Sequence, residues 1–185
     1  SFTMLGLIFV GFLVNGRSFI RLWAGAEYEQ GYYVALMLMF AHMIIMTQSI
    51  GTQILWAKNK HQLQSVIKFV IVAGNILLTI ILIRWDPLMG AAIGTVISLL
   101  LGDVLSMNIV FKKEIGISLK AYYTGLFKGI LPCLLLSALA GTGVKRLPVS
   151  GITGLILNVL VMTAVYAAAM WGFGFNESEK NMVRG

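Results

Sequence analysis

The chain has 185 residues, of which 58% are hydrophobic and only 11% are charged, and its net charge is +7. Soluble globular domains are about 45–50% apolar and about 25% charged, so the composition excludes a soluble domain and predicts an integral membrane protein. The positive charge would suggest a nucleic-acid partner in a soluble domain. Here the lysines and arginines lie between apolar runs, where they act as topology signals and contacts for anionic lipid. We therefore expect membrane lipid as a partner and no nucleic acid.

Six apolar runs are long enough to cross the hydrocarbon core of a bilayer as helices, which takes about 20 residues. They predict an all-α polytopic bundle over residues 1–175, followed by a polar cytoplasmic tail over residues 176–185. The six predicted spans are residues 2–23, 32–56, 62–83, 88–111, 119–141 and 149–173. Transmembrane β-strands would alternate in hydrophobicity over about 10 residues, and runs such as residues 36–40 do not alternate.

The connections between the spans are short, so successive helices are expected to run antiparallel and the connections to alternate between the two sides of the membrane. Nine lysines and arginines fall on the side of the C-terminus and five on the other side. Because cytoplasmic loops carry the excess of Lys and Arg, the C-terminus is predicted to be cytoplasmic. The chain begins at Ser1 without a basic leader and enters an apolar run at once. We therefore expect it to be the C-terminal portion of a longer membrane protein.

Residues 62–111 are predicted to form a helical hairpin in the membrane, with its turn at residues 84–87. Pro87 suits the first turn of the second helix, where a missing N–H costs nothing. Gly90 and Gly94 are four residues apart, so their bare backbones share a face that can approach a neighbouring helix closely. In the fifth span, Pro132 removes a backbone hydrogen bond and is expected to kink the helix. Cys133, the single cysteine, is expected to be a small core residue.

Ionisable side chains inside the membrane are the first candidates for function, because each costs at least about 2.5–3.5 kcal/mol on insertion scales. Asp103, Lys68 and Lys128 lie at similar predicted depths, roughly 9–13 Å from the basic ends of their helices at 1.5 Å per residue. We expect Asp103 to face the bundle interior, near one of the lysines or a polar cavity. In the alternative, the lysines extend to the cytoplasmic interface and a local hydrogen bond holds Asp103.

Other polar side chains extend this set. His42 lies near the middle of the second span and Gln48 towards its cytoplasmic end, where they line an aqueous cavity or join helices by hydrogen bonds. Arg17 and Arg21 are four residues apart on one face of the first span, and their guanidinium groups suit phosphate or lipid headgroups. The sequence has no paired-histidine metal motif, nucleophile elbow or P-loop. We therefore expect no enzyme and no metal or other cofactor.

Five short patterns are spread over nearly the whole chain. They are Phe19-Ile20-x-Leu22-Trp23-x-Gly25-x-x-Tyr28 after the first span, Asn75 in the third, Gly90-Ala91-Ala92-Ile93-Gly94-Thr95 opening the fourth, Lys112-Lys113-x-x-Gly116-Ile117 after it, and Asn176-Glu177-x-Glu179-Lys180 at the end. In this order and spacing they resemble the C-terminal part of polysaccharide repeat-unit flippases, of the O-antigen or capsule type. Those proteins belong to the multidrug/oligosaccharidyl-lipid/polysaccharide flippase superfamily.

The resemblance implies that the six spans are the last six helices of a two-lobed transporter in the bacterial plasma membrane, with the N-terminal lobe as a partner. The substrate would be an undecaprenyl-diphosphate-linked oligosaccharide, moved across the membrane by alternating access for polysaccharide biosynthesis. Arg17, Lys68 or Lys128 would supply positive charge for the diphosphate. His42 and Gln48 would bond sugar hydroxyls.

Two other functions stay open. In a cation-coupled multidrug exporter of the same superfamily, a buried carboxylate such as Asp103 would carry the coupling ion. In a non-transporting scaffold subunit, the helices would only bind partners. A buried polar cavity favours transport, and a uniformly apolar interior favours the scaffold.

Overall fold

The computed structural model describes residues 2–115, 119–145 and 151–174; within these ranges a few side chains, those of residues 125–129 among them, lie outside the description. All regular elements in these ranges are helical. Among the described residues, five helices are long and apolar enough to cross a membrane: Met4–Trp23, Gln30–Thr47, Gln62–Leu82, Pro87–Lys113 and Gly151–Gly172. The chain forms two compact units, one of residues 33–120 and one of residues 3–32 with 121–185, and each is described by itself.

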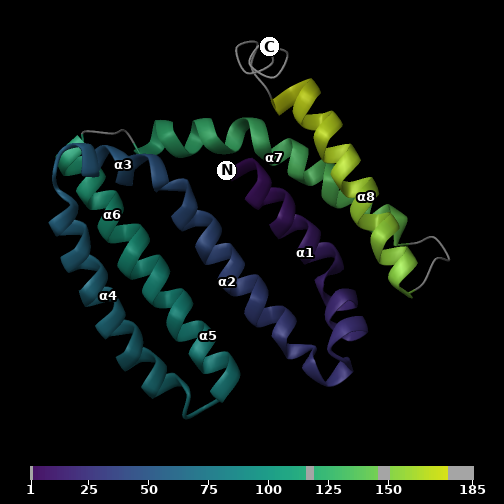
Figure 1. Ribbon diagram of the computed structural model, residues 1–185, viewed down its shortest axis with the longest axis horizontal. Helices are drawn as coiled ribbons and strands as arrows, with labels where there is room; N and C mark the ends of the chain where they lie inside the picture. Colours follow the sequence, from purple (N-terminus) through teal and green to yellow (C-terminus); the bar gives the residue numbers. More distant parts are fainter. Residues whose placement is uncertain (1, 116–118, 146–150, 175–185) are drawn as a thin grey trace. The chain divides into compact units, whose positions relative to one another are not determined.

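The unit of residues 33–120 contains most of α2 (Gln30–Thr47), the short α3 (Ser49–Ala57), α4 (His61–Leu82) and one long helical segment that follows them. That segment consists of α5 (Pro87–Ile97), a π-helical segment (Ser98–Val104), α6 (Leu105–Val110) and a second π-helical segment (Phe111–Ile115). Figure 1 shows α4 and α5 side by side and running in opposite directions. The predicted hairpin of residues 62–111 is confirmed.

The turn of this hairpin is built by local chemistry. Asp86 precedes α5, and its Oδ1 accepts hydrogen bonds from the backbone N–H groups of Leu88 at 2.9 Å and Met89 at 2.8 Å. These groups have no partner within the helix, so the carboxylate caps the helix start. Pro87 occupies the first turn of α5, as predicted.

Glycines bring α5 unusually close to α4. A Cβ atom on Gly90 would lie 2.3 Å from the carbonyl oxygen of Leu82, and one on Gly94 would lie 3.0 Å from Oγ1 of Thr79. A side chain at either position would overlap the neighbouring helix or push against it. The close approach that the glycine spacing predicts is therefore confirmed, and the neighbour is α4.

The π-helical segment Ser98–Val104 continues this contact. The spacing of small residues by four goes on from Gly94 to Ser98 and Gly102, where a Cβ would lie 2.8 Å from Cγ1 of Ile71 on α4. On a pure α-helix, residues spaced by four drift around the axis, because a turn takes 3.6 residues. A π-helical turn holds more residues, so the small residues spaced by four keep facing α4 over a longer stretch of the helix. The sequence analysis did not anticipate this segment.

The prediction of one helix over residues 32–56 is wrong, because the helix breaks at Gln48. This residue has φ −83° and ψ 0°, away from the usual helical values near −63° and −42°. Just before it, the hydroxyl of Thr47 donates to the carbonyl oxygen of Ile44 at 2.6 Å, and the N–H of Gln48 donates to Ile45 at 2.9 Å. Both bonds reach back only three residues and tighten the turn. The composition stays apolar across the break, so periodicity gave no sign of it.

The second unit is built from α1 (Phe2–Trp23), α7 (Leu119–Val144) after its first residues, and α8 (Gly151–Ala169), which a π-helical segment (Met170–Gly174) extends. α1 and α8 match the first and last predicted spans. α7 contains Pro132, and its course is bent in Figure 1, as the kink prediction requires. The described apolar part of α7, Ile130–Val144, is shorter than a bilayer crossing. That residues 119–141 span the membrane stays a prediction.

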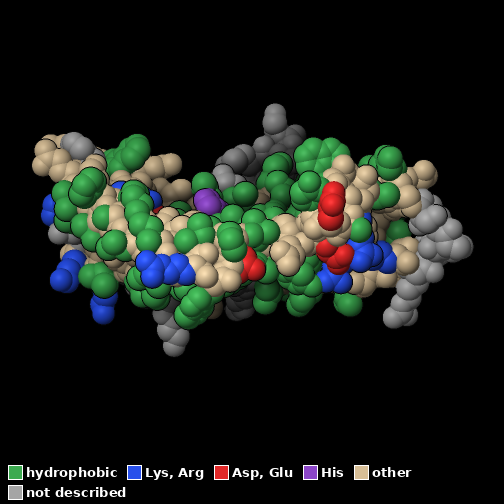
Figure 2. Space-filling model, turned by 90° about the horizontal axis from the view of Figure 1, so that it is seen from below, with side chains coloured by type: hydrophobic (Ala, Val, Ile, Leu, Met, Phe, Trp, Pro, Cys, Tyr) green, Lys and Arg blue, Asp and Glu red, His purple; other side chains and the backbone are tan. Residues whose placement is uncertain are grey.

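Each unit has a small core, and much apolar surface is left outside. Cys133 is fully buried with Leu134 and Tyr166 in the unit that holds α1, α7 and α8, which confirms it as a core residue. In the other unit, Leu55 and Met107 are buried together. Hydrophobic side chains cover much of the face seen in Figure 2. Such a surface would be unfavourable in water and suits lipid.

Candidate functional site

The most deeply buried charge lies in the unit of residues 33–120. Lys68 of α4 and Asp103 of the π-helical segment Ser98–Val104 form a salt bridge between Nζ and Oδ2. The Asp103 side chain is 3% exposed and that of Lys68 is 45% exposed. The expected contact of Asp103 with one of the lysines is thus confirmed, and the partner is Lys68. The π-helical segment carries the acid, which is of interest because such segments are frequent at functional sites.

A second polar contact follows on the same helical segment. Gln48 is buried, and its Nε2 donates to Oδ1 of Asn108 at 2.9 Å and to the carbonyl oxygen of Val104 at 3.1 Å. The broken turn between α2 and α3 is therefore tied to α6. Asn108 was not among the predicted site residues. The signal available for it was an amide inside an apolar run, five residues after Asp103.

Two other predicted residues are not joined to these contacts. His42 is exposed, and its Nδ1 bonds the carbonyl oxygen of Leu38 at 2.9 Å, within α2. This gives the ring a local partner on its own helix. The side chain of Lys128 lies outside the described residues, so its predicted place near Asp103 stays a prediction.

The predicted arginine pair lies in the other unit and shares one acidic partner. Arg17 Nε is 2.8 Å from Oε1 of Glu29, and a terminal nitrogen of Arg21 is 2.6 Å from Oε2. The guanidinium carbon of Arg17 also lies 5.7 Å from the ring centroid of Tyr32. The shared face of the arginines is confirmed. Sequence reasoning missed Glu29, although an acid eight residues beyond Arg21, past a glycine-rich turn, was the available signal.

A cavity of about 400 Å³ opens where α1 and α7 end and α8 begins. Its polar lining residues are Asn15, Ser18, Arg21, Lys145 and Asn158. Lys145 follows α7, and its Nζ donates to the carbonyl oxygen of Val14. Burial, and to a lesser degree the charge of Arg17, lowers the pKa of Lys145 below its usual 10.5. We call this space the polar cavity.

Two buried asparagines form part of its wall. The Nδ2 of Asn158 donates to the carbonyl oxygen of Gly141 at 3.0 Å, while its buried Oδ1 has no hydrogen-bond partner in the described part of the chain. The Nδ2 of Asn15 donates to the carbonyl oxygen of Gly11 at 3.2 Å and contacts the sulfur of Met162 at 3.3 Å. These amides hold the three helices together.

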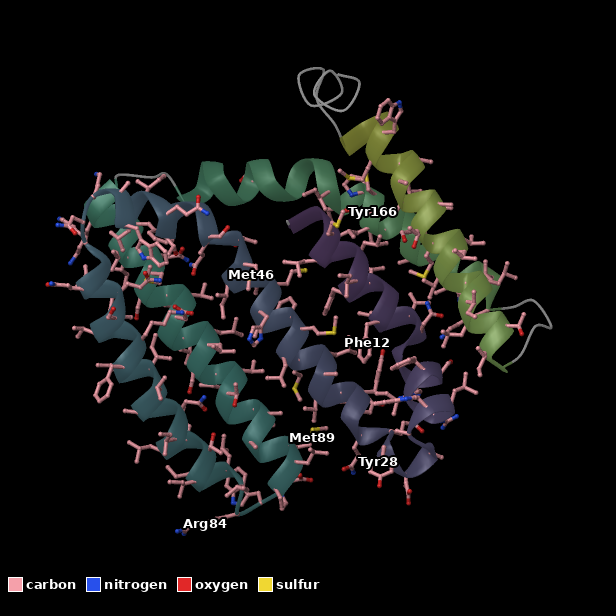
Figure 3. All side chains as sticks on the ribbon, in the orientation of Figure 1. Phe12, Tyr28, Met46, Arg84, Met89 and Tyr166 are labelled. Atoms are coloured by element: carbon pink, nitrogen blue, oxygen red, sulfur yellow. The ribbon has the colours of Figure 1, made fainter. Side chains whose placement is uncertain are left out.

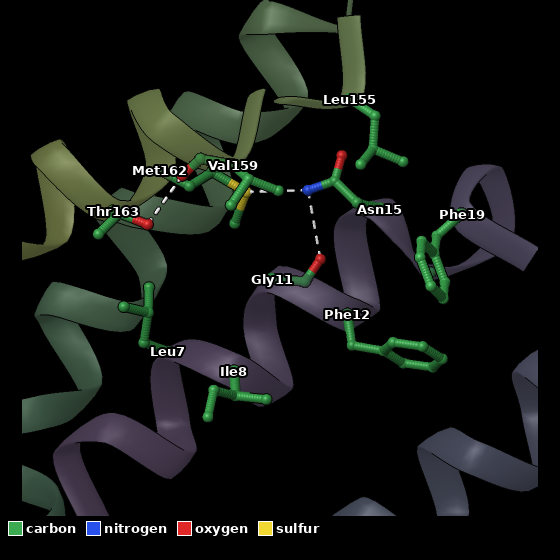
Figure 4. Close-up of a pocket in the computed structure, with 11 residues that line it drawn as sticks. Leu7, Ile8, Gly11, Phe12, Asn15, Phe19, Leu155, Val159, Met162 and Thr163 are labelled. Carbon is green, nitrogen blue, oxygen red and sulfur yellow. Dashed lines mark hydrogen bonds between the residues drawn. The ribbon is translucent and has the colours of Figure 1, made fainter. Parts of the chain in front are cut away.

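A second space, of about 350 Å³, lies between α1 and α8 and is shown in Figure 4. Most of its lining is apolar: Leu7, Ile8, Phe12, Phe19, Val159 and Met162. Asn15 and Leu155 line both this space and the polar cavity. We call it the apolar cavity, and the two cavities adjoin.

Comparison of the chain with protein-family models, with curated proteins and with solved structures finds no match. The class of the protein therefore follows from its own helices. Five of the described helices are long and apolar enough to cross a bilayer, and the few buried polar groups sit among apolar surfaces. The chain is a multi-pass helical membrane protein.

Proposed function

We propose that this chain is the C-terminal part of a flippase that moves an undecaprenyl-diphosphate-linked oligosaccharide across the bacterial plasma membrane. The observation that supports this most is the set of polar side chains buried inside helices with apolar outer faces. They are Asn15, Thr47, Gln48, Ser98, Asp103, Ser137 and Asn158. Some of these groups join helices by hydrogen bonds, as they would in a scaffold too, but a buried charge such as Asp103 is costly inside a membrane and usually functional.

Arg17 of α1 suits the diphosphate. It is exposed beyond its contact with Glu29, and a planar guanidinium group binds phosphate oxygens in pairs. Arg17 keeps its predicted role in this proposal.

Gln48 and His42, the two residues predicted to bond sugar hydroxyls, have different surroundings in the structure. The Nε2 of Gln48 is already used by Asn108 and Val104, so we assign Gln48 mainly to holding α6. His42 is exposed on α2, and its ring is free to reach sugar hydroxyls at Nε2. The charge of Lys68 is balanced by Asp103 in their salt bridge. We therefore assign Lys68 to holding α4 against the π-helical segment in one of the two states of alternating access.

Export of the polysaccharide tests this proposal in cells that make the full-length protein. We expect Arg17→Gln, Lys68→Gln and Lys128→Gln each to lower export several-fold at equal amounts of protein in the membrane. The matched control is Arg84→Gln, because Arg84 extends away from the turn between α4 and α5 (Figure 3). Wild-type export in all three variants would overturn the proposal.

One observation favours a second candidate, a cation-coupled multidrug exporter. Asp103 is a carboxylate at 3% exposure with a lysine as its charged partner, and intramembrane acids of this kind serve as proton or ion relays. In that case Asp103→Asn abolishes efflux of a cationic dye such as ethidium. If cells with the wild-type protein extrude no dye above the background, this candidate is excluded.

A further inference from the structure

The polar and apolar cavities follow one another along α1 and α8 and share the lining residues Asn15 and Leu155. We call the two together the α1–α8 groove. The two helices run antiparallel in it: Arg21 and Gly151 lie at the polar end, and Leu7 and Thr163 lie at the apolar end. Both helices are long and apolar enough to cross a membrane. The polar end is at the end of α1 and the start of α8, so it lies at headgroup level, and the apolar end points into the hydrocarbon.

The polar end favours an anion. Arg21 and Lys145 line it, and Glu29, the salt-bridge partner of Arg21, is not among its described lining residues. The first residue of α8, Gly151, also lines it. The free N–H groups at a helix start attract negative charge, and α8 is 19 residues long.

The apolar end suits a hydrocarbon chain. It is lined by Leu7, Ile8, Phe12, Val159 and Met162 (Figure 4). The ligand that matches both cavities is therefore an amphiphile with an anionic head and an apolar tail.

We propose that the α1–α8 groove binds one anionic phospholipid of the phosphatidylglycerol type. Its phosphate lies near Arg21, Lys145 and the start of α8, and one acyl chain lies in the apolar cavity. Phosphatidylcholine and phosphatidylethanolamine carry no net negative charge, so they match the cations less well. This site does not rest on the transport function.

Native mass spectrometry of the purified protein with added lipids tests the headgroup. We expect phosphatidylglycerol to be retained over phosphatidylethanolamine and phosphatidylcholine. Arg21→Gln and Lys145→Gln should each lower its affinity about fivefold, the effect of one cation near anionic lipid. Arg84→Gln is the control for charge alone. Equal retention of the three lipids, or unchanged affinity in both variants, overturns the proposal.

The acyl chain is tested by filling the apolar cavity. A Cβ on Gly11 meets no atom within 4 Å, so Gly11→Leu fits sterically and occupies the space. Val159→Phe fills it from α8 and serves if the first variant does not fold. The matched control is Gly74→Leu on α4, where a Cβ also meets nothing within 4 Å. We expect loss of phosphatidylglycerol only in the variants that fill the groove.

Competition separates this lipid from other ligands with phosphate. If glycerol phosphate displaces the lipid at equal concentration and Gly11→Leu has no effect, the groove binds a free anion and the lipid proposal fails. A further outcome is that undecaprenyl diphosphate displaces the bound phosphatidylglycerol even when its concentration is below that of phosphatidylglycerol. In that case the groove belongs to a transport substrate and the proposal fails too. Retention of phosphatidylglycerol against both competitors supports it.

Discussion

Removing one charge of the Lys68–Asp103 pair has an effect that can be worked out from the structure. Lys68→Met removes the cation and keeps most of the apolar stem, so Asp103, only 3% exposed, is left without a counter-charge. Breaking a buried pair from one side costs about 3–5 kcal/mol. Lys68 is 45% exposed, so part of this interaction is weakened by its surroundings, and we expect a loss of about 2–3 kcal/mol in unfolding free energy.

The opposite change is milder. Asp103→Asn leaves Lys68, whose long side chain can turn its ammonium group towards the membrane surface, so we expect a loss of about 1 kcal/mol. The double variant leaves neither charge uncompensated and should resemble Asp103→Asn. The two single effects should therefore be non-additive by about 2–3 kcal/mol.

Reversible unfolding in mixed micelles with increasing dodecyl sulfate, followed by tryptophan fluorescence, measures these free energies. The three variants and the wild type form one double-mutant cycle. If the single effects add within about 0.5 kcal/mol, the salt bridge does not stabilise the fold. The reasoning that a membrane acid needs its cation would then be refuted for Asp103.

Three further predictions concern the helix contacts and the polar cavity. Gly90→Ala should destabilise the protein by about 1–3 kcal/mol, because its Cβ would meet the backbone of α4, whereas Gly74→Ala, with open space around it, should be neutral or slightly stabilising. Gln48→Leu should cost about 0.6–1.7 kcal/mol by removing the bonds to Asn108 and Val104, and the effect should be smaller in an Asn108→Leu background, where only the bond to Val104 is left to lose. Because the pKa of Lys145 is lowered by folding, the unfolded chain holds the proton to higher pH, so stability should rise as pH increases towards 10.5, and Lys145→Met should flatten this rise.

The same unfolding assay decides each of the three. Equal effects of the two alanine variants would contradict the close approach of α5 to α4. A full Gln48→Leu effect in the Asn108→Leu background would show that the amide contact does not stabilise the fold. A rise with pH that is unchanged in Lys145→Met would assign the pH dependence to another group.

The sequence predicts the spans because the property that defines them, about 20 apolar residues in a row, is local. The turn at Asp86 and Pro87 is local chemistry too. The partner of Asp103 was also accessible, since depth along two helices can be counted and a charge in lipid needs a counter-charge. Membrane physics thus replaces part of the tertiary information that a soluble protein would require.

The features that sequence reasoning missed depend on contacts between distant segments. Gln48 bonds Asn108, 60 residues away, and Lys145 bonds Val14, 131 residues away. Neither contact leaves a periodic trace. The break at Gln48 is missed for a related reason, because hydrophobicity does not change where the chain tightens by one hydrogen bond. The polar cavity is formed by such contacts between distant segments. The sequence could therefore indicate its residues one by one, but not that they line one cavity.

The π-helical segment Ser98–Val104 joins α5 to α6 and sets how far α6 is rotated relative to α5 about their common axis. An α-helix turns by about 100° for each residue, and a seven-residue π-helical stretch acts as a one-residue insertion in it. Deleting one residue there would swing Asn108 and all that follows away from Gln48, while Gly90 and Gly94 stay seated on α4. The half with Gly90 and Gly94 and the half with Asn108 thus take their orientations independently. Inserting or deleting a single residue between them rotates one half and leaves the other in place.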